Sequence, residues 1–210
     1  MPKWITAEQG TSQWLRSRLG CLTASRMADA MSFTKKGDPT EARRKYQFEL
    51  MAERMTDVMV ERYVTPAMQH GIEYESVARN TYEVITGIMV QSCGFALHDE
   101  IEHCGASPDG LIGDDGLIEI KCPSTQNYIE WYLSGEIPEK HKPQMLLQLA
   151  VTKRKFVDFI AFDPRLPVHN QIFIKRYEPT QDEIVKVQEE AIRFLNEIEL
   201  MWEMIFHAKD

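Results

Sequence analysis

Three side chains near the middle of the chain, Asp109, Glu119 and Lys121, are of the types that bind divalent metals and stabilise charge. Asp109 lies in the turn-forming sequence Ser107-Pro108-Asp109-Gly110, and nine residues separate it from Glu119. Glu119 and Lys121 are two residues apart, and side chains at that spacing on a strand point to the same face. Two acids and one amine around one point are suited to binding a divalent metal and cleaving a phosphodiester.

Each of these residues also has an ordinary structural explanation. Pro, Asp and Gly favour tight turns, and charged residues on a strand commonly face solvent. Here, however, the charged residues alternate with Ile118, Ile120 and Cys122, of which the two isoleucines are expected to face a core. The run then ends at Pro123. This pattern indicates a buried strand edge that leads into a cleft.

A further acid, Glu75, lies in an expected long helix, four residues after Gly71 and on the same helix face. A glycine inside a helix costs roughly 1 kcal/mol relative to alanine. Close approach of a substrate or of another backbone is one reason to accept that cost. The alternative is that Glu73 and Glu75 are surface acids, and a single glycine does not decide between the two.

Two other groups of polar residues have helical spacing. Gln144 and Gln148 are four residues apart on an otherwise apolar helix, where amides either satisfy buried partners or contact a ligand. Trp14 and Arg18 have the same spacing, and Ser25 lies at an expected helix N-terminus, where free N–H groups favour phosphate. Arginine makes bidentate phosphate contacts. The alternative for this second group is a core tryptophan and a solvated arginine.

Composition places limits on the class of protein. A chain of 210 residues that is 43% hydrophobic suffices for one domain with a core, and residues 1–210 contain no repeat or linker-like stretch. No apolar run approaches the roughly 18 residues that span a membrane, and no apolar signal region follows the N-terminus. The four cysteines form no C-x-x-C pair, which argues against a zinc or iron–sulfur site. We therefore expect a cytosolic protein with reduced, structural thiols.

The net charge of −8, taken alone, argues against nucleic acid as a ligand. An enzyme, however, needs a basic channel rather than a basic surface, and bound metal ions invert the field of clustered carboxylates. The acidic excess is also concentrated in the C-terminal segment, whereas residues 35–54 are richer in Lys and Arg. The charge therefore does not exclude a nuclease.

Periodicity, caps and turn residues predict the order of the elements. Helices are expected over residues 11–20, from 23–25 to about 33, and over 40–58, 66–86, 124–134, 142–152 and 180–207. Strands are expected over residues 88–98, 103–111, 116–122, 155–163 and 171–177, with a hairpin turn at residues 113–116. Tyr46 and Leu50, together with Met51 and Met55, are expected to face inward, as are Ile184, Val187, Ala191, Phe194, Leu195, Ile198, Trp202 and Ile205. This order indicates an α/β core with a helical preface.

The motifs together resemble one known family. They are Gln13-Trp14-Leu15-x-x-Arg18-Leu19-Gly20 with Thr23-Ala24-Ser25, Gly71-x-x-Tyr74-Glu75, Ser107-Pro108-Asp109-Gly110-Leu111, Glu119-Ile120-Lys121-Cys122-Pro123, Gln144, Val151-Thr152 and Phe162-Asp163-Pro164-Arg165. The chain resembles the phage lambda exonuclease group of alkaline exonucleases, the YqaJ-like viral recombinases of the PD-(D/E)XK nuclease superfamily. The resemblance implies a restriction-endonuclease-like α/β core, with a central mixed β-sheet flanked by helices, a helical N-terminal preface and a long C-terminal helix.

The same resemblance implies roles for the acidic residues. Asp109, Glu119 and the backbone carbonyl of Ile120 would bind Mg²⁺, and Glu75 would bind a second Mg²⁺ directly or through water, with Mn²⁺ as a possible substitute ion. Lys121 would orient or deprotonate the attacking water, or stabilise developing charge.

It also implies a DNA-binding surface. Arg18, Ser25 and Ser107 would form a pocket for the 5′-phosphate, with Trp14 and Gln144 also contacting DNA. Met68 falls where the family places an apolar wedge that separates the terminal base pair. One departure is Leu146, which stands where the family often has a second glutamine, so which glutamine contacts the site stays open.

The implied activity is 5′-to-3′ degradation of one strand of linear duplex DNA to mononucleotides, by a metal-dependent deoxyribonuclease. The 3′ tail that remains would serve phage-type recombination by single-strand annealing. A ring-shaped homotrimer, a single-strand annealing protein as partner, and a phage or prophage origin in the bacterial cytoplasm are implied as well. Two alternatives remain open: a structure-specific endonuclease of the same superfamily, and a non-catalytic module that binds DNA ends.

Overall fold

A computed structural model describes residues 2–60 and 63–206. Its helices are α1 (Ser12–Ser17), α2 (Met27–Ala30), α3 (Glu41–Thr56), α4 (Pro66–Thr86), α5 (Thr125–Ser134), α6 (Lys142–Thr152) and α7 (Gln181–Phe206). Short 3₁₀ turns are η1 (Ala24–Arg26), η2 (Glu139–His141) and η3 (Val168–Asn170). The strands are β1 (Lys3–Ile5), β2 (Leu22–Thr23), β3 (Val90–Gln91), β4 (Phe95–Leu97), β5 (Cys104–Ala106), β6 (Gly110–Ile112), β7 (Gly116–Lys121), β8 (Phe156–Phe162) and β9 (Ile172–Tyr177). No helix in the described ranges is long and apolar enough to cross a membrane.

The five-stranded sheet is the central mixed sheet expected from the family resemblance, and the remaining strands form a second, four-stranded mixed sheet. One sheet has the order β3-β6-β7-β8-β9, with β7 and β8 parallel, and the other has the order β1-β4-β5-β2, with β2 and β5 parallel. β7 therefore lies in the middle of its sheet, and the expectation of a strand edge is wrong. Its C-terminal end, which carries Glu119 and Lys121, is the part that opens into a cleft.

Two of the strands predicted from the sequence are each divided in the structure, and each divided strand runs from one sheet into the other. The strand expected over residues 88–98 splits into β3 and β4 around Gly94, where a Cβ atom would lie 1.9 Å from the carbonyl oxygen of Ile5. The strand expected over residues 103–111 splits into β5 and β6 at Ser107-Pro108-Asp109. Proline lacks the N–H that a strand interior requires. This second division leaves Asp109 at the joint between the two sheets.

The long helix α4 lies on the five-stranded sheet and has the bounds expected from the sequence. Thr65 caps its start by accepting a hydrogen bond from Met68 N, and Gly87 ends it with a φ of +70°. Ala78 and Tyr82 are buried against β7 and β8. The helix therefore carries Glu75 on a face fixed to the same sheet as Glu119.

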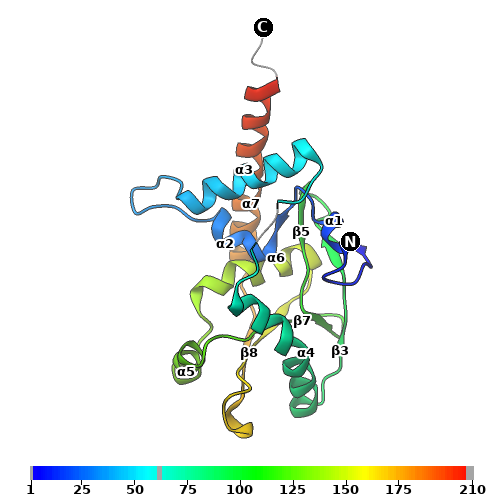
Figure 1. The fold of residues 1–210 in the computed structure, drawn as a ribbon, viewed down its shortest axis with the longest axis vertical. Coiled ribbons are helices and arrows are strands. Elements are labelled where there is room, and N and C mark those ends of the chain that lie inside the picture. The colour runs from blue at the N-terminus through cyan, green and yellow to red at the C-terminus, as the bar shows by residue number, and fades with distance from the viewer. Residues whose placement is uncertain (1, 61–62, 207–210) are drawn as a thin grey trace.

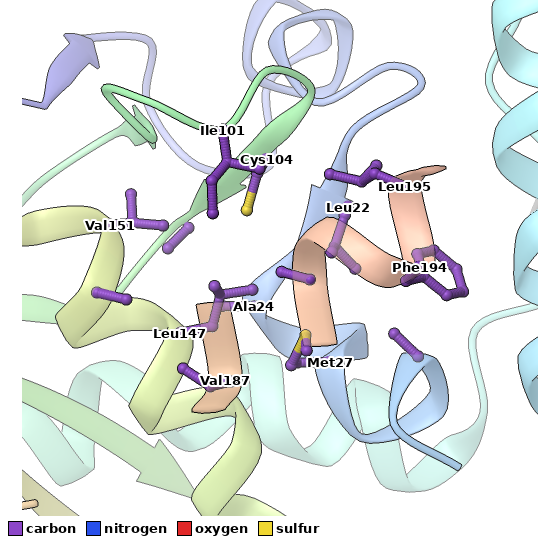
Figure 2. Close-up of a cluster of buried hydrophobic side chains, with 14 of the residues drawn as sticks. Leu22, Ala24, Met27, Ile101, Cys104, Leu147, Val151, Val187, Phe194 and Leu195 are labelled. Carbon is purple, nitrogen blue, oxygen red and sulfur yellow. The ribbon is translucent and has the colours of Figure 1, made fainter. Parts of the chain in front are cut away.

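A second core cluster joins the N-terminal elements to α6 and α7 (Figure 2). Its buried members include Leu22, Ala24, Met27, Leu147, Val151, Val187 and Phe194. The predicted inward face of α7 is confirmed from Val187 to Ile198, but Ile205 is 52% exposed because this end of the helix projects beyond the body of the molecule (Figure 1). Met55 is 47% exposed, which contradicts its expected inward position. Residue 207 of the expected helix lies outside the described residues.

The N-terminal region contains less helix than the sequence suggests. The helix expected from Thr23-Ala24-Ser25 to Phe33 is instead the strand β2, the turn η1 and the short helix α2. Leu22 and Thr23 pair with β5, and this tertiary pairing overrides the local capping signal. Ser25 consequently lies inside η1, and the Thr23 side chain makes no cap hydrogen bond. The helix expected over residues 11–20 ends at Ser17.

Candidate active site

Glu119 lies at the centre of a dense set of hydrogen bonds at the end of β7. Its side chain is 1% exposed. Its Oε1 accepts from Lys121 Nζ at 2.5 Å and from Gln144 Nε2 at 2.6 Å, and its Oε2 accepts from Gln148 Nε2 at 2.6 Å. Glu119 and Lys121 thus project together, as predicted, while Ile118 and Ile120 are buried on the opposite face. Both glutamines contact Glu119, which answers the question that the sequence left open.

Asp109 reaches the same point from the joint between the sheets. Its Oδ2 accepts a hydrogen bond of 2.6 Å from Ile120 N, and its own N donates to Ile118 O at 3.3 Å. The turn is therefore fastened to β7 at two places. Because one fastening uses the carboxylate itself, Asp109 is held beside the Glu119–Lys121 end of the strand.

Burial and neighbouring acids raise the pKa values of two of the three carboxyl groups, Asp109 and Glu75. Burial, followed by the charges of Glu119 and Glu75, raises the pKa of Asp109 well above its usual range. Burial also raises the pKa of Glu75, a rise that the Arg79 guanidinium opposes and Glu119 reinforces. Burial alone would lower the pKa of Lys121, but the carboxylates of Glu119 and Asp109 outweigh it and raise that pKa. These carboxylates therefore favour the ammonium form of Lys121, and three acids share two nearby cations, Lys121 and Arg79.

The donor types at this point fit a hard divalent cation. Carboxylates of Asp109, Glu119 and Glu75 and the main-chain carbonyl of Ile120 are oxygen ligands of the kind that Mg²⁺ prefers. Within residues 2–60 and 63–206, no cluster of three or more His, Cys, Asp or Glu is arranged as a metal centre. The acids here are instead hydrogen-bonded to Lys121, Gln144, Gln148 and Arg79. The match between this site and a divalent cation therefore rests on the oxygen donors and on the repulsion between the neighbouring acids.

A second polar cluster joins three segments of the N-terminal half. Trp14 Nε1 donates to Ser107 Oγ at 3.0 Å, and the Arg18 guanidinium lies 4.1 Å from the centre of the Trp14 ring. Arg18 Nη2 donates to Ser25 Oγ at 3.4 Å. The structure therefore brings together Trp14, Arg18 and Ser25, as their spacing suggested, and places Ser107 beside them, as the family resemblance implied.

Both clusters open into one cleft of about 600 Å³. Most candidate site residues from the sequence line it, namely Trp14, Arg18, Ser25, Met68, Glu75, Ser107, Asp109, Glu119, Ile120, Lys121 and Gln144. Gln148 is fully buried and does not line it. Met68 is 49% exposed at the first turn of α4. The carboxylates and the hydroxyl–guanidinium cluster are thus parts of one continuous surface.

A family model described as the YqaJ-like viral recombinase domain matches residues 13–155, a range that contains every residue of the cleft named above. The chain belongs to the YqaJ-like viral recombinase family. The resemblance drawn from the sequence motifs is therefore confirmed, and the restriction-endonuclease-like PD-(D/E)XK core agrees with this membership.

Three solved structures similar to this chain are structures of exonucleases. The alkaline exonuclease LHK-Exo of Laribacter hongkongensis is 40% identical, with a TM-score of 0.86 over 94% of this chain and 97% of that one. The structure of LHK-Exo in complex with dAMP has the same identity and coverage and a TM-score of 0.87. A phage-related exonuclease from Haemophilus somnus 129PT is 15% identical, with a TM-score of 0.61 over 88% of this chain and 96% of that one, and shares the fold. A search of curated proteins gives no match.

Two residues of this YqaJ-like site were missed by sequence reasoning. Arg79 donates to both Glu75 and the main chain of Asp109; its only signal was its position four residues after Glu75. His141 lines the cleft beside Trp131, and its Nε2 has no hydrogen-bond partner within the described ranges. Burial, followed by the charges of Lys121 and Lys140, lowers the pKa of His141 to about 3, so its imidazole is neutral.

Proposed function

We propose that this chain is a Mg²⁺-dependent 5′-to-3′ exonuclease that degrades one strand of linear duplex DNA to mononucleotides. The observation that carries the proposal is the single cleft in which the Asp109–Glu119–Lys121 site adjoins the Arg18–Ser25–Ser107 cluster. Membership of the viral recombinase family, and 40% identity to an alkaline exonuclease, support a nuclease. The 3′ tail that remains would serve recombination by single-strand annealing.

Phosphodiester hydrolysis is among the slowest uncatalysed reactions, so the protein must lower the barrier by on the order of 20 kcal/mol. Asp109, Glu119 and the Ile120 carbonyl would hold one Mg²⁺, and Glu75 would contribute to a second. Bound Mg²⁺ supplies an activated water and neutralises charge on the scissile phosphate. Lys121, as an ammonium ion, stabilises the charge that develops there. Gln144 and Gln148 hold the Glu119 carboxylate in one orientation.

The polarity of digestion would come from the second cluster. A terminal 5′-phosphate between Arg18, Ser25 and Ser107 would receive a guanidinium and two hydroxyl donors. Trp14 supports this arrangement from both sides, because its N–H bonds to Ser107 and its ring lies against Arg18. The phosphate would then set which bond reaches the metal site, since both clusters line the same cleft.

The chemical step is tested by digesting 5′-phosphorylated linear duplex in Mg²⁺ with the parent protein and Lys121→Ala. Loss of one preorganised charge-stabilising group lowers the rate by about 10²–10³-fold. Lys155→Ala is the matched control, because Lys155 forms an exposed ion pair with Asp115 away from the cleft. Full activity in Lys121→Ala would contradict the assignment, and cleavage of closed circular duplex by the parent would favour an endonuclease.

The phosphate pocket is tested by comparing 5′-phosphorylated with 5′-hydroxyl ends. The parent should prefer phosphorylated ends, and Arg18→Ala should lose that preference. Arg16→Ala is the control, since Arg16 lies in the last turn of α1, two residues before Arg18, but pairs with the exposed Asp57. A preference that survives in Arg18→Ala would rule out the pocket, and end binding with no nucleotide release in Mg²⁺ would indicate a non-catalytic module.

We propose that Met68 acts as a wedge against the terminal base pair, because it is half-exposed in the cleft at the start of α4. Met68→Ala should slow digestion of duplex DNA more than digestion of single strands, because strand separation loses its apolar support. The comparison is the ratio of the two rates in parent and variant. An unchanged ratio would leave the wedge without support.

The wider setting is also proposed. We propose a ring-shaped homotrimer; the exposed apolar residues Val84 and Ile85 near the end of α4 support an interface between copies of the chain. A single-strand annealing protein would load onto the exposed 3′ strand in the cytoplasm of a bacterial host. Co-sedimentation of the two purified proteins tests this partnership, and failure to form any complex at micromolar concentration would contradict it.

A further inference from the structure

The turn that carries Asp109 is held from its rear by an arginine. Arg79 Nη2 donates to the main-chain oxygen of Asp109 at 2.6 Å and to Glu75 Oε1 at 3.3 Å. Its Nη1 donates to Ser92 Oγ at 3.3 Å, on the loop between β3 and β4. A single guanidinium thus joins α4, the joint between the sheets and a neighbouring loop.

Two other side chains hold this side of the turn, Gln9 and Cys93, and both donate to the Pro108 carbonyl rather than to Asp109. A cavity of about 630 Å³ lies behind it, lined by Glu75, Arg79 and Asp109 together with Gln9. Gln9 Nε2 donates to the carbonyl oxygens of Pro108 at 2.8 Å and Cys93 at 3.3 Å. Because a cavity rather than packed side chains backs the turn, hydrogen bonds must fix the position of Asp109 there.

We propose that Arg79 is a positioning residue that sets the separation between Glu75 and Asp109, and through them the geometry of the metal site. This inference rests on the proposed function. The planar guanidinium suits the task, because its donors lie in a fixed fork and one nitrogen reaches partners on two separate elements. A lysine ammonium at this position is a point charge without that fork.

Removing Arg79 should change metal affinity in opposite directions, depending on whether Arg79 positions the metal ligands or acts only as a positive charge. A guanidinium close to a cation site repels the cation, so if Arg79 acted only as a charge, its removal would tighten metal binding. If Arg79 positions the ligands, its removal weakens metal binding. Changes to groups that orient metal ligands lower metal affinity by about 10–100-fold.

The experiment is calorimetric titration of Mn²⁺ into the full-length protein without DNA. We expect Arg79→Gln to bind Mn²⁺ at least about 10-fold more weakly than the parent, with Arg79→Lys in between. Arg154→Gln is the matched control, because Arg154 Nη1 donates to the carbonyls of Ile112, Gly113 and Gly116 at the other end of the β6–β7 hairpin. It removes an arginine clamp from the same hairpin and should leave Mn²⁺ affinity within about twofold of the parent.

Unchanged or tighter Mn²⁺ binding in Arg79→Gln would overturn the inference, as would an equal loss in Arg154→Gln. If Arg79→Gln does not fold, Arg79→Lys decides, and parent-like Mn²⁺ affinity in that variant would overturn the role of the forked guanidinium.

Duplex digestion by the parent is measured in parallel. One outcome would refute this inference and leave the proposed function standing: the parent binds Mn²⁺ and degrades DNA, and Arg79→Gln binds Mn²⁺ with the same affinity as the parent. A parent that neither binds Mn²⁺ nor degrades DNA would refute both.

Discussion

Burial and the charges of Glu119 and Glu75 raise the pKa of Asp109, and burial together with the charge of Glu119 raises the pKa of Glu75. The raised pKa of Asp109 means that folding favours its protonated form. A group with a raised folded-state pKa contributes stability below its unfolded pKa, and that stability is lost as pH rises through the folded value. Without a cation, ionisation of these acids therefore destabilises the folded protein at neutral pH. A bound cation would offset that destabilisation.

The first prediction concerns Asp109→Asn in the presence of a chelator. Ionisation of Asp109 destabilises the folded protein as pH rises, and the neutral amide of asparagine does not ionise. The variant should therefore be more stable than the parent at pH 8. Each unit of pKa shift corresponds to about 1.4 kcal/mol, and we expect a difference of about 1 kcal/mol or more. The difference should shrink toward pH 4, because the parent carboxyl is then protonated.

Urea denaturation across this pH range measures the effect, and the variant should have lost DNA cleavage. The exposed Asp114→Asn is the control, and we expect its effect to stay within about 0.5 kcal/mol. A variant that is less stable than the parent at pH 8 would contradict the description of the site.

The sequence identified the residues that line the cleft better than it identified the residues that hold them in position. Asp109, Glu119 and Lys121 were found because a turn and a strand of period two bring them together through local geometry. Arg79 was not found, because on sequence alone it is one more charged residue on a helix. Its contact with the main chain of Asp109 spans 30 positions and depends on how α4 meets the sheet joint.

At the scale of elements, α4 and α6 have the bounds that the sequence predicted, because proline, glycine and apolar periodicity act within a few residues. The order of the strands and their division between two sheets were not predicted from the sequence. Which strands pair is decided by contacts far apart in the chain, such as β1 with β4 and β2 with β5. The same long-range pairing replaced the start of the expected helix at residues 23–25 with a strand.

The second prediction concerns the attachment of α4 to its sheet. Tyr82 is fully buried, and its hydroxyl donates to Asp158 Oδ2 at 2.7 Å, while Arg176 holds both oxygens of the same carboxylate. Tyr82→Phe leaves a buried charged acceptor with one donor fewer. We expect a loss of about 1–3 kcal/mol in the free energy of unfolding.

Urea denaturation measures that loss, with the exposed Tyr63→Phe as control. A Tyr82→Phe variant as stable as the parent would show that the hydrogen bond does not fix α4 to β8.

The whole molecule has a net charge of −8, yet the proposed function places DNA in its cleft. A nuclease of this charge depends on local cations, namely Arg18, Lys121 and the metal ions, to receive the phosphates. The two sheets share a joint at Asp109, and α6 and α7 pack with the N-terminal elements in one cluster. We propose that residues 1–210 form one nuclease domain, and expect a single cooperative unfolding transition.

Assembly is the third prediction. Three copies around DNA would keep the enzyme on its substrate through successive cleavages, and sedimentation at micromolar concentration should give about three times the chain mass of 24.4 kDa. Mutating the exposed Val84 and Ile85 to Asp should shift the mass toward one chain. Leu133→Asp, on α5, offers a comparison of another exposed apolar residue. A monomer in the parent would contradict the ring.

The direction of digestion is measured most directly with one linear duplex that is phosphorylated at both 5′ ends and labelled, in separate reactions, at its 5′ or its 3′ termini. In Mg²⁺, we expect 5′ label to appear at once as mononucleotide, while 3′ label stays in long strands throughout the early reaction. Release of 3′ label first, or of 5′ label only within oligonucleotides, would contradict a 5′-to-3′ exonuclease.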